Sequence, residues 1–189
     1  YLWTFPLAKM LDVIGDRAPP DTSFAKQALV LNEGNAEHAH ELRSFRQTYR
    51  DELAGALELA VPTMLRTVAA LRDDPARDVD AFDTNDARAA HRILIEAGMT
   101  PEGRLALRTA HVGATLHAAT RWNRTKQLTS NDLPDFLHAQ SAIAYCNAFF
   151  TDGPTKHLLE QENLQLQEDY GCFTASNEEA ALTWLRSDR

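Results

Sequence analysis

Two short β-prone runs near the carboxyl end constrain the fold of this chain most strongly. Ala148–Thr151 and Gly171–Ala175 are separated by about twenty residues that read as a helix. A helix precedes the first run, and Ser176–Glu179 forms a capping box that opens another helix after the second. Strands joined through a helix pair in parallel, because a tight hairpin cannot join them. The order helix, strand, helix, strand, helix over 130–186 therefore predicts an α/β layered fold.

The chain before this unit reads as helical to about residue 128. We expect a long helix capped by Asn35 and interrupted near Pro62, and another over 101–122 that Thr100 caps. The apolar run in Gln27–Glu33 fits either a buried strand or a helix. Residues 73–85 are acidic and irregular, so we expect a loop there. The whole length of 189 residues suits one domain, 1–189, with a sizeable core.

Charge and composition narrow the class of protein. The net charge of −8 argues against a protein that coats nucleic acid through bulk electrostatics, but not against a nuclease whose site is built from carboxylates. No apolar run is long enough to span a membrane, and the first residues lack the features of a secretory signal. The two cysteines, Cys146 and Cys172, are too far apart for a zinc motif. We expect both to be buried thiols in a cytoplasmic protein.

Two acids near the carboxyl end suggest a metal site. Asp135 falls in the first turn of a predicted helix, and Asp152 follows the first predicted strand. Ligands of α/β proteins bind at the carboxyl ends of parallel strands, where hard carboxylate oxygens suit Mg²⁺ or Mn²⁺. A structural alternative stays open, because Asp132 and Asp135 also suit a helix start and Asp152 suits a turn before Gly153.

The same segment resembles the closing motif of PIN domains. The resemblance covers about 130–186 and is carried by Asp135-Phe136-Leu137-His138-Ala139 and by Ala148-Phe149-Phe150-Thr151-Asp152. It implies a three-layer PIN-like sandwich with a short parallel sheet and a large helical portion. It also implies a Mg²⁺- or Mn²⁺-dependent ribonuclease, as in bacterial toxin or defence systems. Asp135 and Asp152 would be catalytic metal ligands, assisted by Asp132, His138 and Thr151.

The other acids of that family are not identified by the sequence. In that family, the opening strand ends in an acid. Asp12 is a faint match to this acid, but the helical periodicity around it predicts a surface residue of a helix. Asp83-Thr84-Asn85 has the residue types of that motif, but it follows an acidic loop and precedes a helix, so we reject it. The opening strand can lie upstream of Tyr1. For the second acid, a glutamate on an early helix, Glu33, Glu37 and Glu41 are candidates.

Basic residues between 101 and 127 are candidates for RNA binding. This segment has five basic residues and one acidic residue, a local net charge of +4. The five are Arg104, Arg108, Arg121, Arg124 and Lys126. On one continuous helix, Arg104, Arg108 and His111 would form a stripe that follows an RNA backbone, or a solvated face. Trp122 could stack on a base, or it could be a core residue or an anchor of the helix end.

These observations lead to one leading hypothesis and two alternatives. The leading one is a PIN-like endoribonuclease that binds RNA, with an inhibitor protein or a second copy of the chain as further partners. The first alternative is a non-catalytic helical interaction module, derived from such a fold but lacking its full acidic site. The second is a metal-dependent phosphatase-like hydrolase on a similar sheet.

Overall fold

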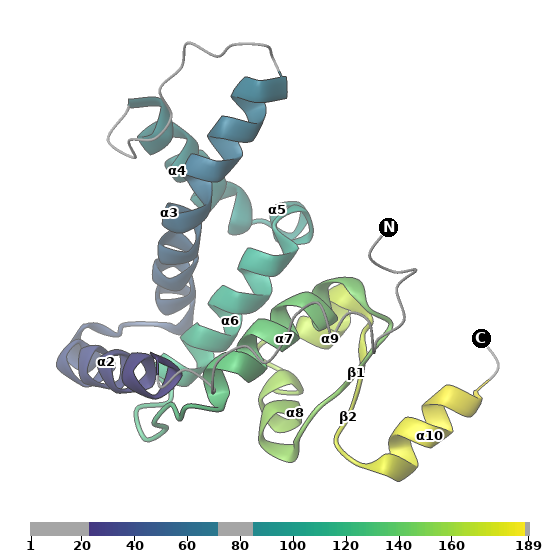
Figure 1. Ribbon diagram of the computed structural model, residues 1–189. Helices are drawn as coiled ribbons and strands as arrows, with labels where there is room; N and C mark the ends of the chain where they lie inside the picture. The colour runs from purple at the N-terminus through teal and green to yellow at the C-terminus, as the bar shows by residue number, and fades with distance from the viewer. Residues whose placement is uncertain (1–22, 72–84, 188–189) are drawn as a thin grey trace.

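The computed structural model describes residues 23–71 and 85–187, and this part of the chain is mainly helical with one small parallel sheet (Figure 1). The helical first half comprises α2 (Ser23–Glu37), the 3-10 turn η2 (Ala39–Glu41), α3 (Phe45–Leu71), α4 (Asn85–Gly98), α5 (Pro101–Ala106) and α6 (Arg108–Trp122). The second half comprises α7 (Asp132–Tyr145), β1 (Ala148–Phe150), α8 (Gly153–Leu159), α9 (Leu166–Tyr170), β2 (Phe173–Ala175) and α10 (Glu178–Arg186).

The two predicted strands pair in parallel, which confirms a mixed α/β fold. Ala148 lies opposite Phe173, and Phe150 lies opposite Ala175. The Thr151 N–H donates to the Ala175 carbonyl at 2.9 Å and extends the pairing by one residue. Helices α8 and α9 form the connection between the strands, as the sequence pattern predicts.

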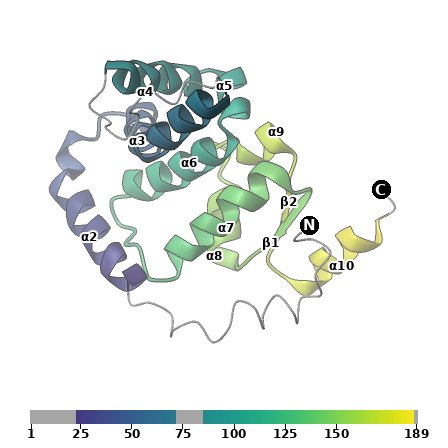
Figure 2. The ribbon, with the colours of Figure 1, turned by 45° about the horizontal axis from the view of Figure 1, so that its top comes forward.

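Helix α6 is the centre of the packing. It lies between α3 and α7 in Figure 2 and contributes to both hydrophobic clusters of the core. Small residues along it allow close approach of the neighbouring helices. A Cβ atom added to Gly113, for example, would lie 2.8 Å from the Gln140 side chain of α7. This packing fixes the start of α7, and with it Asp135, relative to the helical half.

In the first helices, the structure decides one open alternative and contradicts two expectations. Residues Gln27–Glu33 lie within α2, where Leu29 is 63% exposed, so of the two alternatives they form the helix and not a buried strand. Helix α3 begins at Phe45 and not after Asn35, and the Ser44 hydroxyl accepts a hydrogen bond from the Gln47 N–H at 3.2 Å. Helix α3 also continues through Pro62, which removes one backbone donor without ending the helix.

The predicted helix over 101–122 is two helices. Thr100 caps the first as expected, accepting a hydrogen bond from the Gly103 N–H at 3.1 Å. The chain then breaks at Leu107, whose dihedral angles of −102° and 38° are not helical. Gly103 packs so closely on α4 that an added Cβ would lie 1.8 Å from the Ala97 carbonyl oxygen. This contact holds α5 against the end of α4.

Three smaller features concern the cysteines, the cap of the last helix and the membrane. Cys172 is buried as expected, but Cys146 is exposed, because it follows the last residue of α7 at the surface. Asn177, and not Ser176, caps α10 through a 2.8 Å bond to the Ala180 N–H. Within the described residues, no helix is both long and apolar enough to cross a membrane.

Candidate metal site

Asp152 stands at the carboxyl end of β1 and caps the helix that follows. Its backbone is extended, with φ −76° and ψ 170°, and its Oδ1 accepts a hydrogen bond from the Thr155 N–H at 2.8 Å. Pro154 in the first turn of α8 strengthens this helix start. The side chain is exposed. Only Oδ1 is used by the cap within the described part of the chain, so Oδ2 is available to a cation.

Asp135 lies in the first turn of α7, is half-buried and interacts electrostatically with Asp152. Burial raises the pKa of Asp135, and the negative charge of Asp152 raises it further. The nearby charges of His138 and Lys126 act in the opposite direction but do not cancel this effect. Among the described residues, none donates a hydrogen bond to the Asp135 carboxylate. Two neighbouring carboxylates without a shared cationic partner fit the binding of a divalent cation.

Asp132 is already occupied by other partners. Its Oδ2 accepts hydrogen bonds from the Thr129 N–H at 2.7 Å and the Thr129 hydroxyl at 2.6 Å. The Lys126 ammonium donates to its Oδ1 at 2.8 Å. Burial opposes ionisation of Asp132, but these hydrogen bonds outweigh it and hold its pKa below the usual value. Asn131 is the N-cap residue of α7, so Asp132 reaches back to the preceding loop instead of capping the helix.

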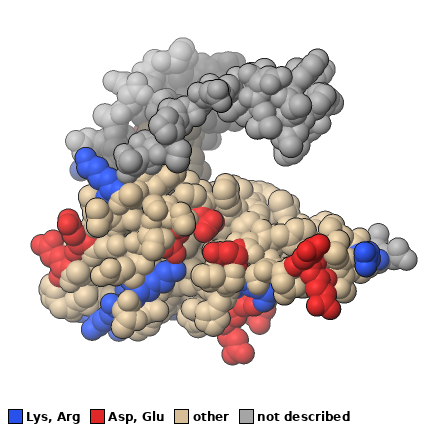
Figure 3. All heavy atoms as spheres, turned by 60° about the horizontal axis from the view of Figure 1, so that its bottom comes forward, with Lys and Arg blue, Asp and Glu red and all other residues tan. Residues whose placement is uncertain are grey.

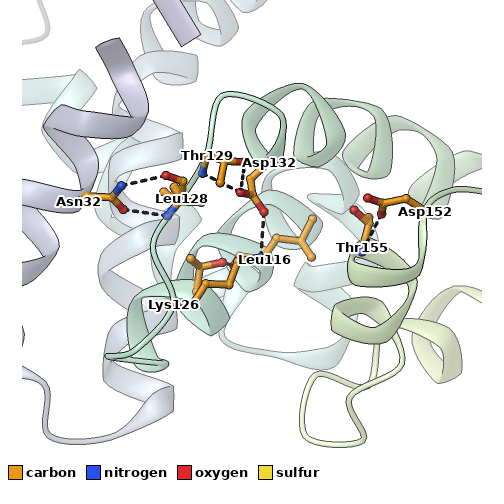
Figure 4. A network of polar contacts seen from close by, with 9 residues as sticks. Asn32, Leu116, Lys126, Leu128, Thr129, Asp132, Asp152 and Thr155 are labelled. Atoms are coloured by element: carbon orange, nitrogen blue, oxygen red, sulfur yellow. Dashed lines mark hydrogen bonds and ion pairs between the residues drawn. The ribbon is translucent and has the colours of Figure 1, made fainter. Parts of the chain in front are cut away.

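The loop before α7 is therefore held on two sides. Figure 4 shows Asp132 bonded to Thr129 and Lys126, whereas Asp152 is bonded to Thr155. The Asn32 side chain of α2 donates to the Leu128 carbonyl at 2.9 Å and accepts from the Leu128 N–H at 2.8 Å. Asp132 thus serves to position the start of α7, on which Asp135 lies.

The remaining predicted groups lie around this pair without completing a metal site. His138 is exposed one turn after Asp135, and Thr151 is half-buried beside Asp152. Within residues 23–71 and 85–187, no three His, Cys, Asp or Glu side chains converge as they would around a metal ion. A cation on Asp135 and Asp152 would therefore need water molecules or further ligands.

The candidates for the family's other acids do not join Asp135 and Asp152 in the described structure. Glu33 and Glu37 belong to α2, and Glu41 ends η2. Glu41 Oε1 lies 3.1 Å from His38 Nδ1, and this contact lowers the Glu41 pKa. Asp12 and Asp83 lie outside the described residues.

The predicted RNA-binding residues do not form one stripe. The break at Leu107 separates Arg104 from Arg108, and His111 is only 2% exposed, so the expected Arg104, Arg108 and His111 stripe was wrong. Arg108 instead donates to the Leu105 and Ala144 carbonyls, at 3.0 Å and 3.2 Å.

The other three basic residues lie together at the end of α6. Arg121, Arg124 and Lys126 line one small pocket beside α2. Arg121 pairs with Glu52 at 2.9 Å, and Lys126 pairs with Asp132. Arg124 is exposed, and Trp122 at the end of α6 is 40% exposed and thus not a core residue. On the face drawn in Figure 3, lysine and arginine atoms form small groups separated by acidic and neutral surface.

A buried polar cluster in the helical half was not predicted. His111 of α6 contacts both Tyr49 of α3 and Asp169 of α9. Tyr49 and Asp169 lie 62 and 58 residues from His111 along the chain, so no local spacing could have revealed this cluster.

Comparisons of this chain with protein families, with curated proteins and with solved structures found no match.

Proposed function

We propose that this chain is a PIN-like, metal-dependent endoribonuclease in which Asp135 and Asp152 bind Mg²⁺ or Mn²⁺. The observation that carries the proposal is the raised pKa of Asp135 beside Asp152, at the carboxyl end of a parallel strand. Repulsion between two carboxylates destabilises the site unless a cation lies near them. The order of elements around them supports the closing unit of a three-layer PIN-like sandwich.

Each residue of the site has a separate task in this proposal. Asp152 keeps Oδ1 on the Thr155 N–H and offers Oδ2, which fixes the direction of its carboxylate. Asp132 and Lys126 hold the start of α7 and keep Asp135 in place. A bound divalent ion would neutralise charge on a phosphodiester and lower the pKa of an attacking water. Further carboxylates and a further strand would come from outside the described residues.

RNA would approach from the end of α6 in this proposal. The Arg124 side chain is exposed, and Trp122 beside it offers an aromatic face for a base. Arg121 and Lys126 line the same pocket, although each already pairs with an acid. Arg104 and Arg108 lie nearer the α5–α6 break and would make at most peripheral contacts. We propose that the protein acts in the cytoplasm, where RNA substrates and reduced cysteines are found.

The second candidate function is a non-catalytic scaffold of the same ancestry. One observation favours it: the described residues supply two carboxylates to the site and no third metal ligand. Such a scaffold would keep the loop contacts of Asp132 and the helix cap at Asp152 for stability alone.

Cleavage of single-stranded RNA in the presence of Mn²⁺ tests the proposal. We expect cleavage by the full-length protein and at least about hundredfold slower cleavage by Asp135→Asn and Asp152→Asn. Glu58→Gln, an exposed change on α3 away from the site, is the matched control and should cleave normally. Unaltered cleavage by both aspartate variants would remove these residues from the mechanism. No cleavage by the intact protein, or cleavage of phosphomonoesters alone, would favour the scaffold or a phosphatase-like hydrolase.

A further inference from the structure

The helical half contains a cavity that the proposed nuclease site does not use. It has a volume of about 230 Å³ and lies between α3, the α5–α6 corner and the loop before α9. Its polar lining residues include Arg46, Tyr49, Arg104, His111, Asn163 and Gln165. Gln165, the residue before α9, has a φ of 57°, an unfavourable left-handed conformation for a residue other than glycine. The volume is below that of typical pockets for drug-sized molecules and suits a small ligand.

Arg104 brings an uncompensated positive charge to this cavity. Its guanidinium carbon lies 5.7 Å from the centre of the Tyr49 ring, and the side chain is half-buried. Its Nε is buried without a hydrogen-bond partner, and no carboxylate of the described chain forms an ion pair with it. A bond from the Tyr170 hydroxyl to the Arg104 carbonyl, 3.1 Å long, fixes the backbone beneath it. Arg104 is therefore positioned to receive an anion.

The buried cluster beside Arg104 is satisfied by a neutral His111. His111 Nε2 lies 3.3 Å from the Asp169 carboxylate, which accepts, so the proton of a neutral ring belongs on Nε2. Nδ1 then accepts a hydrogen bond, and the Thr115 hydroxyl, 3.3 Å away, can donate it while the Tyr49 hydroxyl donates to the Gly98 carbonyl at 3.0 Å. His111 therefore brings no charge to the cavity.

The surroundings of His111 also favour the neutral form of the ring. Burial lowers the His111 pKa, the hydrogen bond with Asp169 raises it, and the positive charge of Arg104 lowers it, with a net value of about 4. Tyr49 and Tyr170 also face the ring, and burial holds the pKa of Tyr49 at about 12 and raises that of Tyr170, so both stay neutral. With His111 neutral, Arg46 and Arg104 supply the positive charge among the lining residues of the cavity.

We propose that this cavity binds a phosphate-class oxyanion, anchored by Arg104. The Arg104 guanidinium and the side-chain amides of Asn163 and Gln165 together provide the donors that phosphate oxygens require. Free phosphate and the phosphate group of a nucleoside monophosphate share this chemistry. The aromatic rings of Phe45 and Tyr49 in the same wall would favour the nucleotide.

Calorimetric titration of the full chain with inorganic phosphate and, separately, with uridine 5′-monophosphate tests the proposal. We expect binding with a dissociation constant of roughly 1 mM or lower for at least one of them. Tighter binding of the nucleotide identifies it as the source, and equal binding identifies free phosphate. Arg104→Gln should weaken binding at least about tenfold, because a charge-assisted hydrogen bond is lost. Arg92→Gln, an exposed change on α4 outside the cavity, should leave binding unchanged.

Nitrogen NMR of the Arg104 guanidinium in the intact protein provides a readout that does not depend on a variant. The Arg104 Nε resonance should shift when the anion is added. Absence of binding by both anions, equal binding by Arg104→Gln, or an Arg104 Nε resonance that does not move would each overturn the proposal.

Discussion

Asp152 has two roles in this account, and two substitutions separate them. Its Oδ1 caps α8 through the 2.8 Å bond to the Thr155 N–H. Asparagine keeps an oxygen at this position and caps about as well as aspartate, whereas alanine leaves the N–H unpaired. Loss of an N-cap costs about 1 kcal/mol of the free energy of unfolding. In a chain of this length, that change lowers the melting temperature by about 2–4 °C.

Thermal unfolding followed by circular dichroism, with and without Mn²⁺, measures both roles. Without metal, we expect the 2–4 °C loss in Asp152→Ala and a melting temperature within about 1 °C of the parent in Asp152→Asn. Saturating Mn²⁺, at about 100 times its dissociation constant, should stabilise the parent by about 2.7 kcal/mol and neither variant. Equal destabilisation by both substitutions without metal would refute the capping argument. Equal stabilisation of all three proteins by Mn²⁺ would place the metal elsewhere.

Three further predictions concern the helical half. In urea unfolding, Tyr49→Phe should lower the free energy of unfolding by about 1–3 kcal/mol, because the Gly98 carbonyl and His111 lose the hydroxyl that they contact. Tyr145→Phe, at the surface, should change this free energy by less than about 0.5 kcal/mol. Gly103→Ala should lower the free energy of unfolding by about 3 kcal/mol or more, because its Cβ would clash with the Ala97 backbone. Gly55→Ala, in the middle of α3 with open space around it, should raise this free energy by about 0.5–1 kcal/mol. Similar effects of the two substitutions would refute the close packing of Gly103. His111 has a folded-state pKa of about 4 against about 6.5 unfolded, so the unfolded chain binds more protons in between. Stability should therefore fall as pH drops from about 6.5 to 4, and His111→Gln should flatten that part of the curve; an unchanged curve would contradict the burial of a neutral imidazole.

The closing half of the fold could be predicted because each element carries a local signal. Asp152, Gly153 and Pro154 together mark the end of a strand and the start of a helix, and the structure has both there. The parallel pairing of β1 with β2 follows from the helical connection alone. The positions of Asp135 and Asp152 on these elements followed from the same signals.

The helical half was less predictable because tertiary contacts decide its details. Ala28-Leu29-Val30-Leu31 is a run that periodicity cannot assign to a strand or a helix, and packing on α7 through Ala28 selects a helix. The break at Leu107 accompanies the close contact of Gly103 with α4, which no helix signal encodes. His111 is buried by partners about sixty residues away, so its role was invisible in the sequence.

The central claim is that Asp135 and Asp152 share one divalent cation. Electron paramagnetic resonance during titration with Mn²⁺ tests it most directly, because free Mn²⁺ gives a strong signal that decreases on binding. We predict a bound ion in the full chain, which is lost in Asp135→Asn and in Asp152→Asn and retained in Glu58→Gln. Retention of the bound ion by both aspartate variants, or no binding by the intact chain, would contradict the claim.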